Sequence, residues 1–403
     1  MGTDCSIPGA AAAIDPRKCS ALWFAEPFRI FFPIGLLLGA IGVALWPLFV
    51  WHAIGFYPAQ AHVRLMIEGL MGSFIIGFLG TAGPRLLDAS PLIAAETCAL
   101  LALQIVSAFL HLTQRQTAGD TVFLVLFLLF LGLMARRARA RHDLPPPHFV
   151  LVLFGLFNAI IGIFLITAAK SITNGLFLNQ LGGLMLNEGF VLFPILGVGA
   201  FFFPKLLGGA KPEPSDLRIA SALWRKRAAI AALAALVIWS SFVLEALGWT
   251  RTAALVRGLT TLTYFVTQGH LLERPSGPPF LAQCFRVGAL LLVAGLFLPA
   301  VLPAYRVANL HLSFIGGFSI IVFTVSTRVI LGHAGQSHLF RERLRFLIAA
   351  LALLVVATIA RVGADFILPA RNSHLVYAAL IWLLAAAVWA WALVPKLRLS
   401  GDE

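Results

Sequence analysis

The chain has 403 residues, of which 60% are apolar and only 12% are charged. Soluble domains carry about 25% charged residues, so this composition excludes an ordinary soluble enzyme and is typical of a polytopic membrane protein. The net charge of +13 would suit a nucleic-acid-binding protein, but the basic residues lie between apolar runs, in alternate loops. We therefore expect contact with anionic lipid and no nucleic-acid partner.

The apolar runs predict an all-α bundle of about twelve transmembrane helices, since a spanning helix needs about 20 mostly apolar residues. We expect a tail at 1–26 and one membrane domain at 27–398, whose halves 27–203 and 225–398 are joined by the loop 204–224. The expected spans are 28–50, 59–83, 92–112, 120–136, 147–168, 178–203, 226–247, 252–271, 279–301, 307–332, 343–363 and 373–394. The fourth and eighth have the weakest apolar pattern, and the eighth contains Arg257.

Basic residues divide unevenly between the two sides of this drawing. The tail and the loops that follow even-numbered spans hold most of the lysines and arginines, including the run from Arg136 to Arg141. The positive-inside rule then places both termini in the cytoplasm. The four cysteines show no metal-binding spacing.

Two histidines fall at equal depth in the second and tenth spans. His62 and His311 each lie about one turn inside the outer end of a span. A polar ring in hydrocarbon needs a partner, and two imidazoles can hold a haem iron. Below His62, one helical face carries Met66 and Gly69, while Arg64 could pair with a haem propionate. The alternative is that each ring binds a backbone carbonyl and packs a helix end.

Other polar residues inside the spans suggest a second site. Arg328 and His333 lie at the cytoplasmic end of span ten, where they could bind an anion or a quinone head group or simply reach the interface. Glu188 in span six is expected either to pair with an arginine or to serve a proton path. His374, at the outer entry to span twelve, could add an imidazole to an outer metal site or be a solvated interfacial residue.

Several blocks of the sequence resemble the NnrS family. They are Pro27-Phe-Arg-Ile-Phe-Phe32, Ala61-His62 with Met66 and Gly69, Gly77-Phe-Leu-Gly-Thr-Ala-Gly-Pro84, His311 with Gly316, Thr327-Arg-Val-Ile-Leu-Gly-His-Ala-Gly335, and Trp382 with Val394-Pro-Lys-Leu397. The block from Thr327 is the most specific. The resemblance implies a bacterial inner-membrane protein of twelve spans that carries haem and copper and is linked to denitrification and nitric-oxide tolerance.

One departure from the family pattern bears on copper. The family's second span usually starts with His-x-His-Glu-Met, whereas this chain has His62-Val-Arg64-Leu-Met66. The second histidine and the glutamate are absent. The resemblance therefore implies haem b and leaves copper in doubt.

A more remote likeness is to the catalytic subunit of haem–copper oxidases. That family holds a low-spin haem with histidines on spans two and ten, which match His62 and His311 here, whereas its first span-ten histidine would align with Asn309. The likeness implies that the low-spin pair is kept and that the ligands of the high-spin haem and copper are lost.

Together these patterns predict a low-spin haem b between His62 and His311, with Arg64 on a propionate and Met66, Gly69 and Gly316 packed against the ring. Electron transfer or sensing in the nitric-oxide response is then expected, with a redox partner or quinol, and an enzymatic role stays open. The alternatives are a transporter that uses the polar face of span six and a cofactor-free partner subunit.

Overall fold

A computed structural model describes residues 23–207, 219–274 and 280–400, and every regular element in these ranges is helical. Most of the predicted tail, and residues 208–218 of the predicted central loop, lie outside the described residues. The first half contains α2 (Phe28–Val50), α3 (Ala59–Arg64), η1 (Leu65–Met71), α4 (Gly72–Leu86), α5 (Ala94–Leu112), α6 (Gln116–Arg139), α7 (Phe149–Ala169), α8 (Leu176–Leu184), η2 (Met185–Gly189) and α9 (Phe190–Leu206). The second half contains α10 (Ala222–Ala246), α11 (Thr250–Thr267), α12 (Phe280–Val301), η3 (Pro303–Tyr305), α13 (Arg306–His311), η4 (Leu312–Ser319), α14 (Ile320–His333), η5 (Ser337–Arg341), α15 (Arg345–Phe366), η6 (Leu368–Ala370), α16 (Arg371–Leu393) and η7 (Val394–Arg398).

The predicted fold class is confirmed. Each predicted span has a helical counterpart, and eleven of these helices are long and apolar enough to cross a membrane. The exception within the described ranges is α11, whose 18 residues include two arginines and six threonines. This helix corresponds to the eighth predicted span, which had a weak apolar pattern. Its Arg257 forms ion pairs with two buried glutamates.

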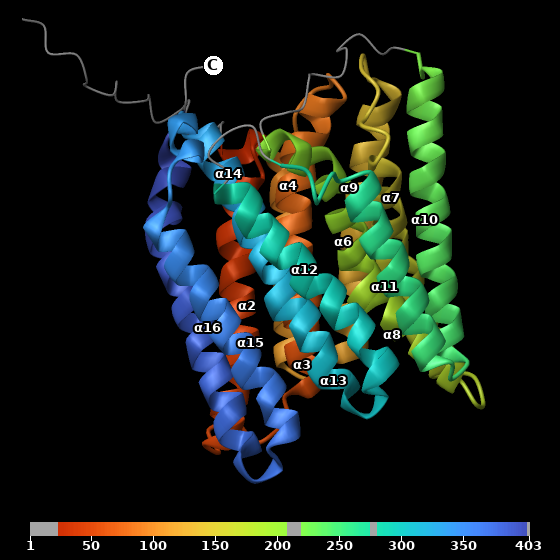
Figure 1. Ribbon diagram of the computed structural model, residues 1–403, viewed down its shortest axis with the longest axis vertical. Coiled ribbons are helices and arrows are strands. Elements are labelled where there is room, and N and C mark those ends of the chain that lie inside the picture. The colour runs from red at the N-terminus through yellow and green to blue at the C-terminus, as the bar shows by residue number, and fades with distance from the viewer. Residues whose placement is uncertain (1–22, 208–218, 275–279, 401–403) are drawn as a thin grey trace, which may run out of the picture.

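Three spans form the interior of the bundle. The most buried are α3–η1–α4, α13–η4–α14 and α8–η2–α9, with 83%, 78% and 72% of their apolar windows inside the protein. By contrast, α5, α6 and α15 are 33% buried and face outward. Figure 1 shows the long helices running side by side, with α16 and α10 on opposite flanks.

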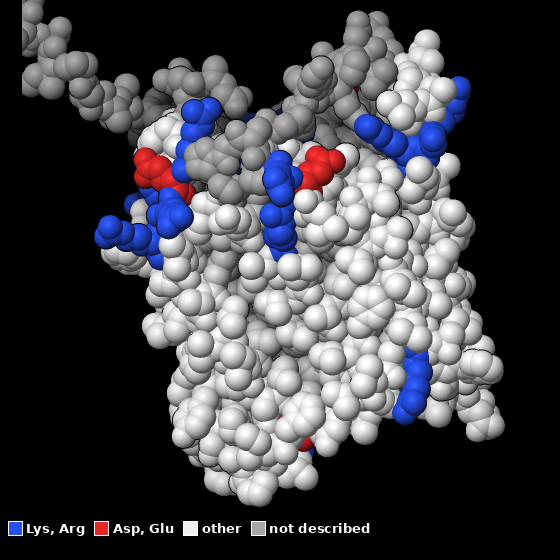
Figure 2. Space-filling view, viewed as in Figure 1, with Lys and Arg blue, Asp and Glu red and all other residues white. Residues whose placement is uncertain are grey.

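The two ends of the described chain meet at one end of the bundle. Arg29, near the start of α2, donates to the carbonyl of Leu399 at 2.8 Å and also to that of Leu397. Lysines and arginines gather at this end (Figure 2), so the positive-inside rule predicts that it faces the cytoplasm, and we call it the cytoplasmic end and the opposite end the outer end. The helices α3, α8 and α13 then lie toward the outer end (Figure 1).

Candidate functional site

A cavity of about 470 Å³ opens between the three interior spans in the outer part of the bundle. This volume falls in the range of about 300–1,000 Å³ that holds small molecules and cofactors. Its wall is mostly apolar and aromatic, formed by Val43, Trp46, Val63, Met66, Ile67, Met71, Leu184, Val307, Leu310, Phe314, Ile315, Leu375 and Trp382. The cavity is therefore large and apolar enough for a flat organic cofactor.

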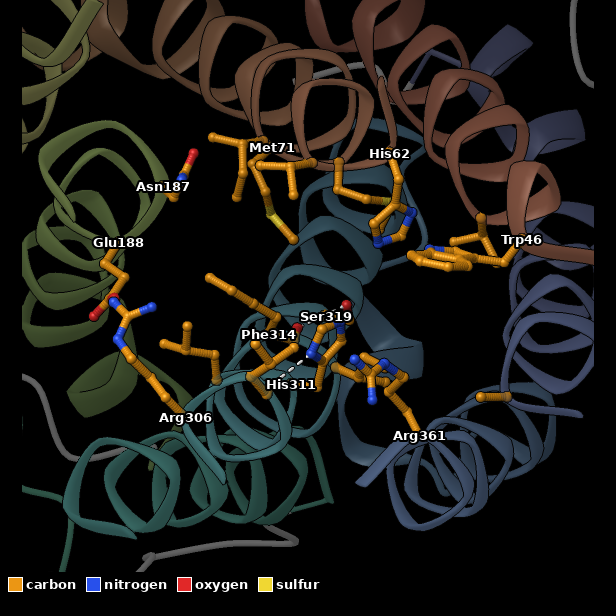
Figure 3. Close-up of a pocket in the computed structure, with 18 of the residues that line it drawn as sticks. Trp46, His62, Met71, Asn187, Glu188, Arg306, His311, Phe314, Ser319 and Arg361 are labelled. Atoms are coloured by element: carbon orange, nitrogen blue, oxygen red, sulfur yellow. Dashed lines mark hydrogen bonds and ion pairs between the residues drawn. The ribbon is translucent and has the colours of Figure 1, made fainter. Parts of the chain in front are cut away.

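His62 and His311 both line this cavity (Figure 3). The Nδ1 atom of His62 lies 2.9 Å from the carbonyl oxygen of Gly42, and that of His311 lies 2.7 Å from the carbonyl oxygen of Val307. A carbonyl only accepts, so each Nδ1 carries the proton and donates it, and each Nε2 keeps its lone pair. The structure thus brings together the two predicted histidines in the tautomer that a metal-bound imidazole adopts.

The cavity lies where the interior spans depart from regular α-helix. The segments η1, η2 and η4 are π-helical, and each contributes side chains to the wall, such as Met66, Asn187 and Phe314. Single-turn π-helices are rare and frequently occur at functional sites. The wider turn redirects the side chains that follow it, and three such turns here surround one space.

Two polar residues of the wall, Glu188 and Arg306, belong to an ion network that extends behind it. Arg257 of α11 contacts Glu188 and Glu245 at 2.5 Å each, and donates to Ser241 Oγ at 3.1 Å. Arg306 completes the network, 2.6 Å from Glu245 and 3.1 Å from Glu188. Two arginines and two glutamates cancel in charge, which explains how α11 can be so polar in the bundle. Glu188 is thus paired with arginine, one of its two predicted alternatives.

Arg361 is a second arginine on the cavity wall, and it pairs with one carboxylate where Arg306 pairs with two. Arg361 of α15 lines the cavity and lies 3.2 Å from a single carboxylate, that of Asp365. The indole of Trp382 also lines the cavity, is 1% exposed, and its Nε1 has no hydrogen-bond partner among the described residues. A guanidinium and an unpaired N–H donor are both suited to an acidic group bound in the cavity.

Arg64, predicted to pair with a propionate, lies elsewhere. It is not among the cavity-lining residues. Its guanidinium makes two contacts with Asp120, Nε to Oδ1 at 2.6 Å and Nη2 to Oδ2 at 3.1 Å. One further N–H reaches Asn187 of the cavity wall at 3.4 Å. The sequence could not reveal this pairing, because 56 residues separate Arg64 from Asp120.

The predicted packing residues divide into two groups. Met66 lines the cavity, whereas Gly69 and Gly316 do not. A side chain at Gly69 would meet Leu38 at 3.1 Å, and one at Gly316 would meet Leu291 at 3.3 Å. Both glycines therefore lie at close helix contacts outside the cavity lining, and their packing against a haem ring stays a prediction.

The residues of the predicted second site lie in three separate places. Glu188 belongs to the ion network above. Arg328 lies over the ring of Phe340, with 4.5 Å from its Cζ to the ring centre. His333 Nε2 lies 2.7 Å from Arg85 and 3.8 Å from Glu26. Arg328 and His333 thus have different partners at the cytoplasmic end.

His374 lies outside the cavity, near its outer edge. It packs near Tyr377, with 6.4 Å between the ring centres, and is not a cavity-lining residue. Its Nδ1 atom has no hydrogen-bond partner in the described structure. The structure does not bring His374 together with His62 and His311.

One cluster of possible metal ligands was missed by sequence reasoning. Glu68, His111 and Asp120 are each 1% exposed, and their nearest ligand atoms all lie within 4.8 Å of one another. The sequence held a usable signal, since Glu68 and Asp120 are carboxylates within apolar spans and such residues rarely lack a role.

Comparison with known proteins agrees with this architecture. The family model described as NnrS protein matches residues 22–399, which cover nearly the whole chain. A search of curated proteins finds no match. The match includes every residue that lines the cavity, and it confirms the resemblance found in the sequence blocks. The chain therefore belongs to the NnrS protein family.

Proposed function

We propose that this chain is a haem b protein of the bacterial inner membrane that acts in the response to nitric oxide by electron transfer or sensing. The observation that carries the proposal is the pair His62 and His311. Both rings face one apolar cavity, and each is held through Nδ1 by a backbone carbonyl, at 2.9 Å and 2.7 Å. Imidazoles fixed in this way present Nε2 to a metal.

The donor set of the cavity fits haem. Two imidazole nitrogens suit the iron, the aromatic and aliphatic wall suits the porphyrin, and a cation with a free N–H suits the propionates. Arg361 is better placed for this last role than Arg306. Arg306 already contacts two glutamates, whereas Arg361 contacts the single carboxylate of Asp365 at 3.2 Å. Trp382 Nε1 would be the second donor.

When bound, haem b would supply reversible one-electron chemistry. The role of this chain's residues would be to hold the iron between His62 and His311 and to exclude water. An iron held by both histidines would have no free site for a gas ligand, and this favours electron transfer or sensing over reduction of nitric oxide at that iron. The apolar wall around Phe314 and Met66 would shield a bound ring from water on that side.

Spectra of the purified protein test the proposal. We expect a sharp low-spin reduced-minus-oxidised spectrum, with one haem per chain, that is lost in His62→Ala and in His311→Ala. His374→Ala is the matched control, since this histidine lies near the same membrane face but outside the cavity, and it should keep full haem content. Equal haem content in the wild type and both alanine variants, with all proteins folded, would overturn the assignment.

A second candidate is transport without redox chemistry. Asn179, Gln180 and Asn187 make one side of the cavity polar, as a solute path requires. The same preparation distinguishes the two functions. Folded protein that stays colourless with haem supplied in excess would favour transport.

A further inference from the structure

The cluster of Glu68, His111 and Asp120 lies on the other side of η1 from the haem cavity. Met66, Ile67 and Met71 of this segment line the cavity, whereas Glu68 contacts His111 of α5, with 2.9 Å between Oε2 and Nε2. Asp120 of α6 lies 3.9 Å from the same Nε2. The cluster is thus a separate buried site at the α5–α6 face, and nothing in the haem proposal uses it.

The imidazole of His111 is held in one position and one tautomer. Its Nδ1 lies 2.8 Å from Gln116 Oε1, and the amide of Gln116 is itself oriented by donation to the carbonyl of His111 at 3.3 Å. The ring also fills the space beside Gly119, where an added Cβ would come within 2.4 Å of it. Because Gln116 presents its oxygen, His111 carries its proton on Nδ1.

A neutral His111 in this tautomer would leave a cation missing. The Nε2 lone pair of His111 points at Glu68 Oε2 across 2.9 Å, so two acceptors face each other. Two acceptors at this distance require a proton or a metal ion between them. The charges agree, since Glu68 and Asp120 contribute two negative charges and Arg64, 3.2 Å and 2.6 Å from them, contributes one positive charge.

Glu68 also has an unused ligand atom. Its Oε1 makes no hydrogen bond in the described part of the chain, because the N–H of Arg64 Nε, which lies 3.2 Å away, is directed to Asp120. A buried ionised oxygen that accepts no hydrogen bond is costly. The site therefore has one nitrogen and two carboxylates converging, with a free oxygen and a deficit of positive charge.

We propose that His111 Nε2, Glu68 and Asp120 Oδ1 bind a divalent first-row transition-metal ion. Imidazole with carboxylates suits ions of the Zn²⁺ and Fe²⁺ class. Ligand bonds of about 2.0–2.2 Å put neighbouring ligand atoms about 3.3–3.6 Å apart in a tetrahedral site, and the present separations of 2.9 Å and 3.9 Å lie on either side of this range. Gln116 orients His111 through Nδ1, and Arg64 orients Asp120 through both carboxylate oxygens.

Zinc uptake by the detergent-purified, chelator-treated chain tests the site. After equilibrium dialysis against Zn²⁺, we expect one tightly bound ion per chain in the wild type and none in His111→Gln or Glu68→Gln. Gln116→Ala, which removes only the group that orients the ring, should weaken binding by about 10–100-fold. His52→Asn changes an exposed histidine and is the control for uptake at the surface.

Zinc content and zinc K-edge X-ray absorption are both independent of the haem colour. The proposal is supported by nitrogen and oxygen neighbours with an imidazole signature that His111→Gln removes. It is overturned if the folded wild type takes up no more zinc than His111→Gln, which would mean that a proton alone completes the cluster. The haem absorption spectrum of the same sample reports the haem, so failure of one site is distinguished from failure of the other.

Discussion

The outer and cytoplasmic halves of the bundle use their interiors in different ways. The outer half holds the 470 Å³ cavity, the Arg257 network and the Glu68 cluster. The cytoplasmic half is filled by stacked rings, such as Phe32 against Phe74 at 4.6 Å between centres, and keeps a mostly apolar cavity of about 70 Å³. The difference indicates that the cytoplasmic half is closely packed, whereas the outer half keeps polar groups and an open space in its interior.

The largest expected effect comes from replacing Arg257, which lies at the centre of the outer ion network. Arg257→Leu leaves Glu188 and Glu245 buried with Arg306 alone, and we expect a loss of about 3–5 kcal/mol in the free energy of unfolding. Chemical unfolding in detergent, followed by tryptophan fluorescence, measures this loss. Arg371→Leu is the matched control, because its contact with Asp365 is 3.8 Å long and half-exposed, so it should cost at most about 1 kcal/mol. Equal effects from the two variants would contradict a special role for the network.

A change in the cytoplasmic half should affect stability alone. Trp389 is 1% exposed, packs against Phe323 and donates to Thr327 Oγ1 at 3.1 Å. Replacing a buried tryptophan by alanine costs about 3–5 kcal/mol. We expect Trp389→Ala to unfold more easily, while the folded fraction keeps the haem content and spectrum of the wild type. A spectral shift in that variant would break the division between the two halves.

The smallest expected effects are those of alanine substitutions at two adjacent glycines of η4. A Cβ at Gly317 would come within 2.8 Å of the backbone of Leu292, whereas one at Gly316 would meet side-chain atoms of Leu291 at 3.3 Å and of Leu312 at 3.4 Å. We expect Gly317→Ala to cost about 1–3 kcal/mol and Gly316→Ala about 0.5 kcal/mol or less. Thermal unfolding measures both. Loss of haem in Gly316→Ala without loss of stability would support the predicted contact with the ring.

The sequence predicted the spans well because each needs a long apolar run. The first prediction, 28–50, matches α2, and the weakest, 252–271, became the polar helix α11. Equal depth in the membrane also predicted one level for His62 and His311, since helices that cross from the same side put matching positions at one level, and both residues line the cavity.

The rest of the site depends on side-chain partners that lie far apart in the chain. Arg64 was predicted to contact a propionate because it lies near His62 in sequence, but its guanidinium is hydrogen-bonded to Asp120. Arg361 was overlooked because nothing near it in sequence marks it as a cavity residue. The π-helical turns were also missed, because they depend on packing between spans and leave no period in the sequence.

The central claim is that His311 and His62 jointly hold one haem, and ligand replacement tests it most directly. In His311→Gly, the low-spin electron paramagnetic resonance signal of the oxidised protein should disappear, and added imidazole should restore it by filling the vacated space. His374→Gly should keep the signal without imidazole. A wild-type low-spin signal that persists unchanged in His311→Gly would contradict the account.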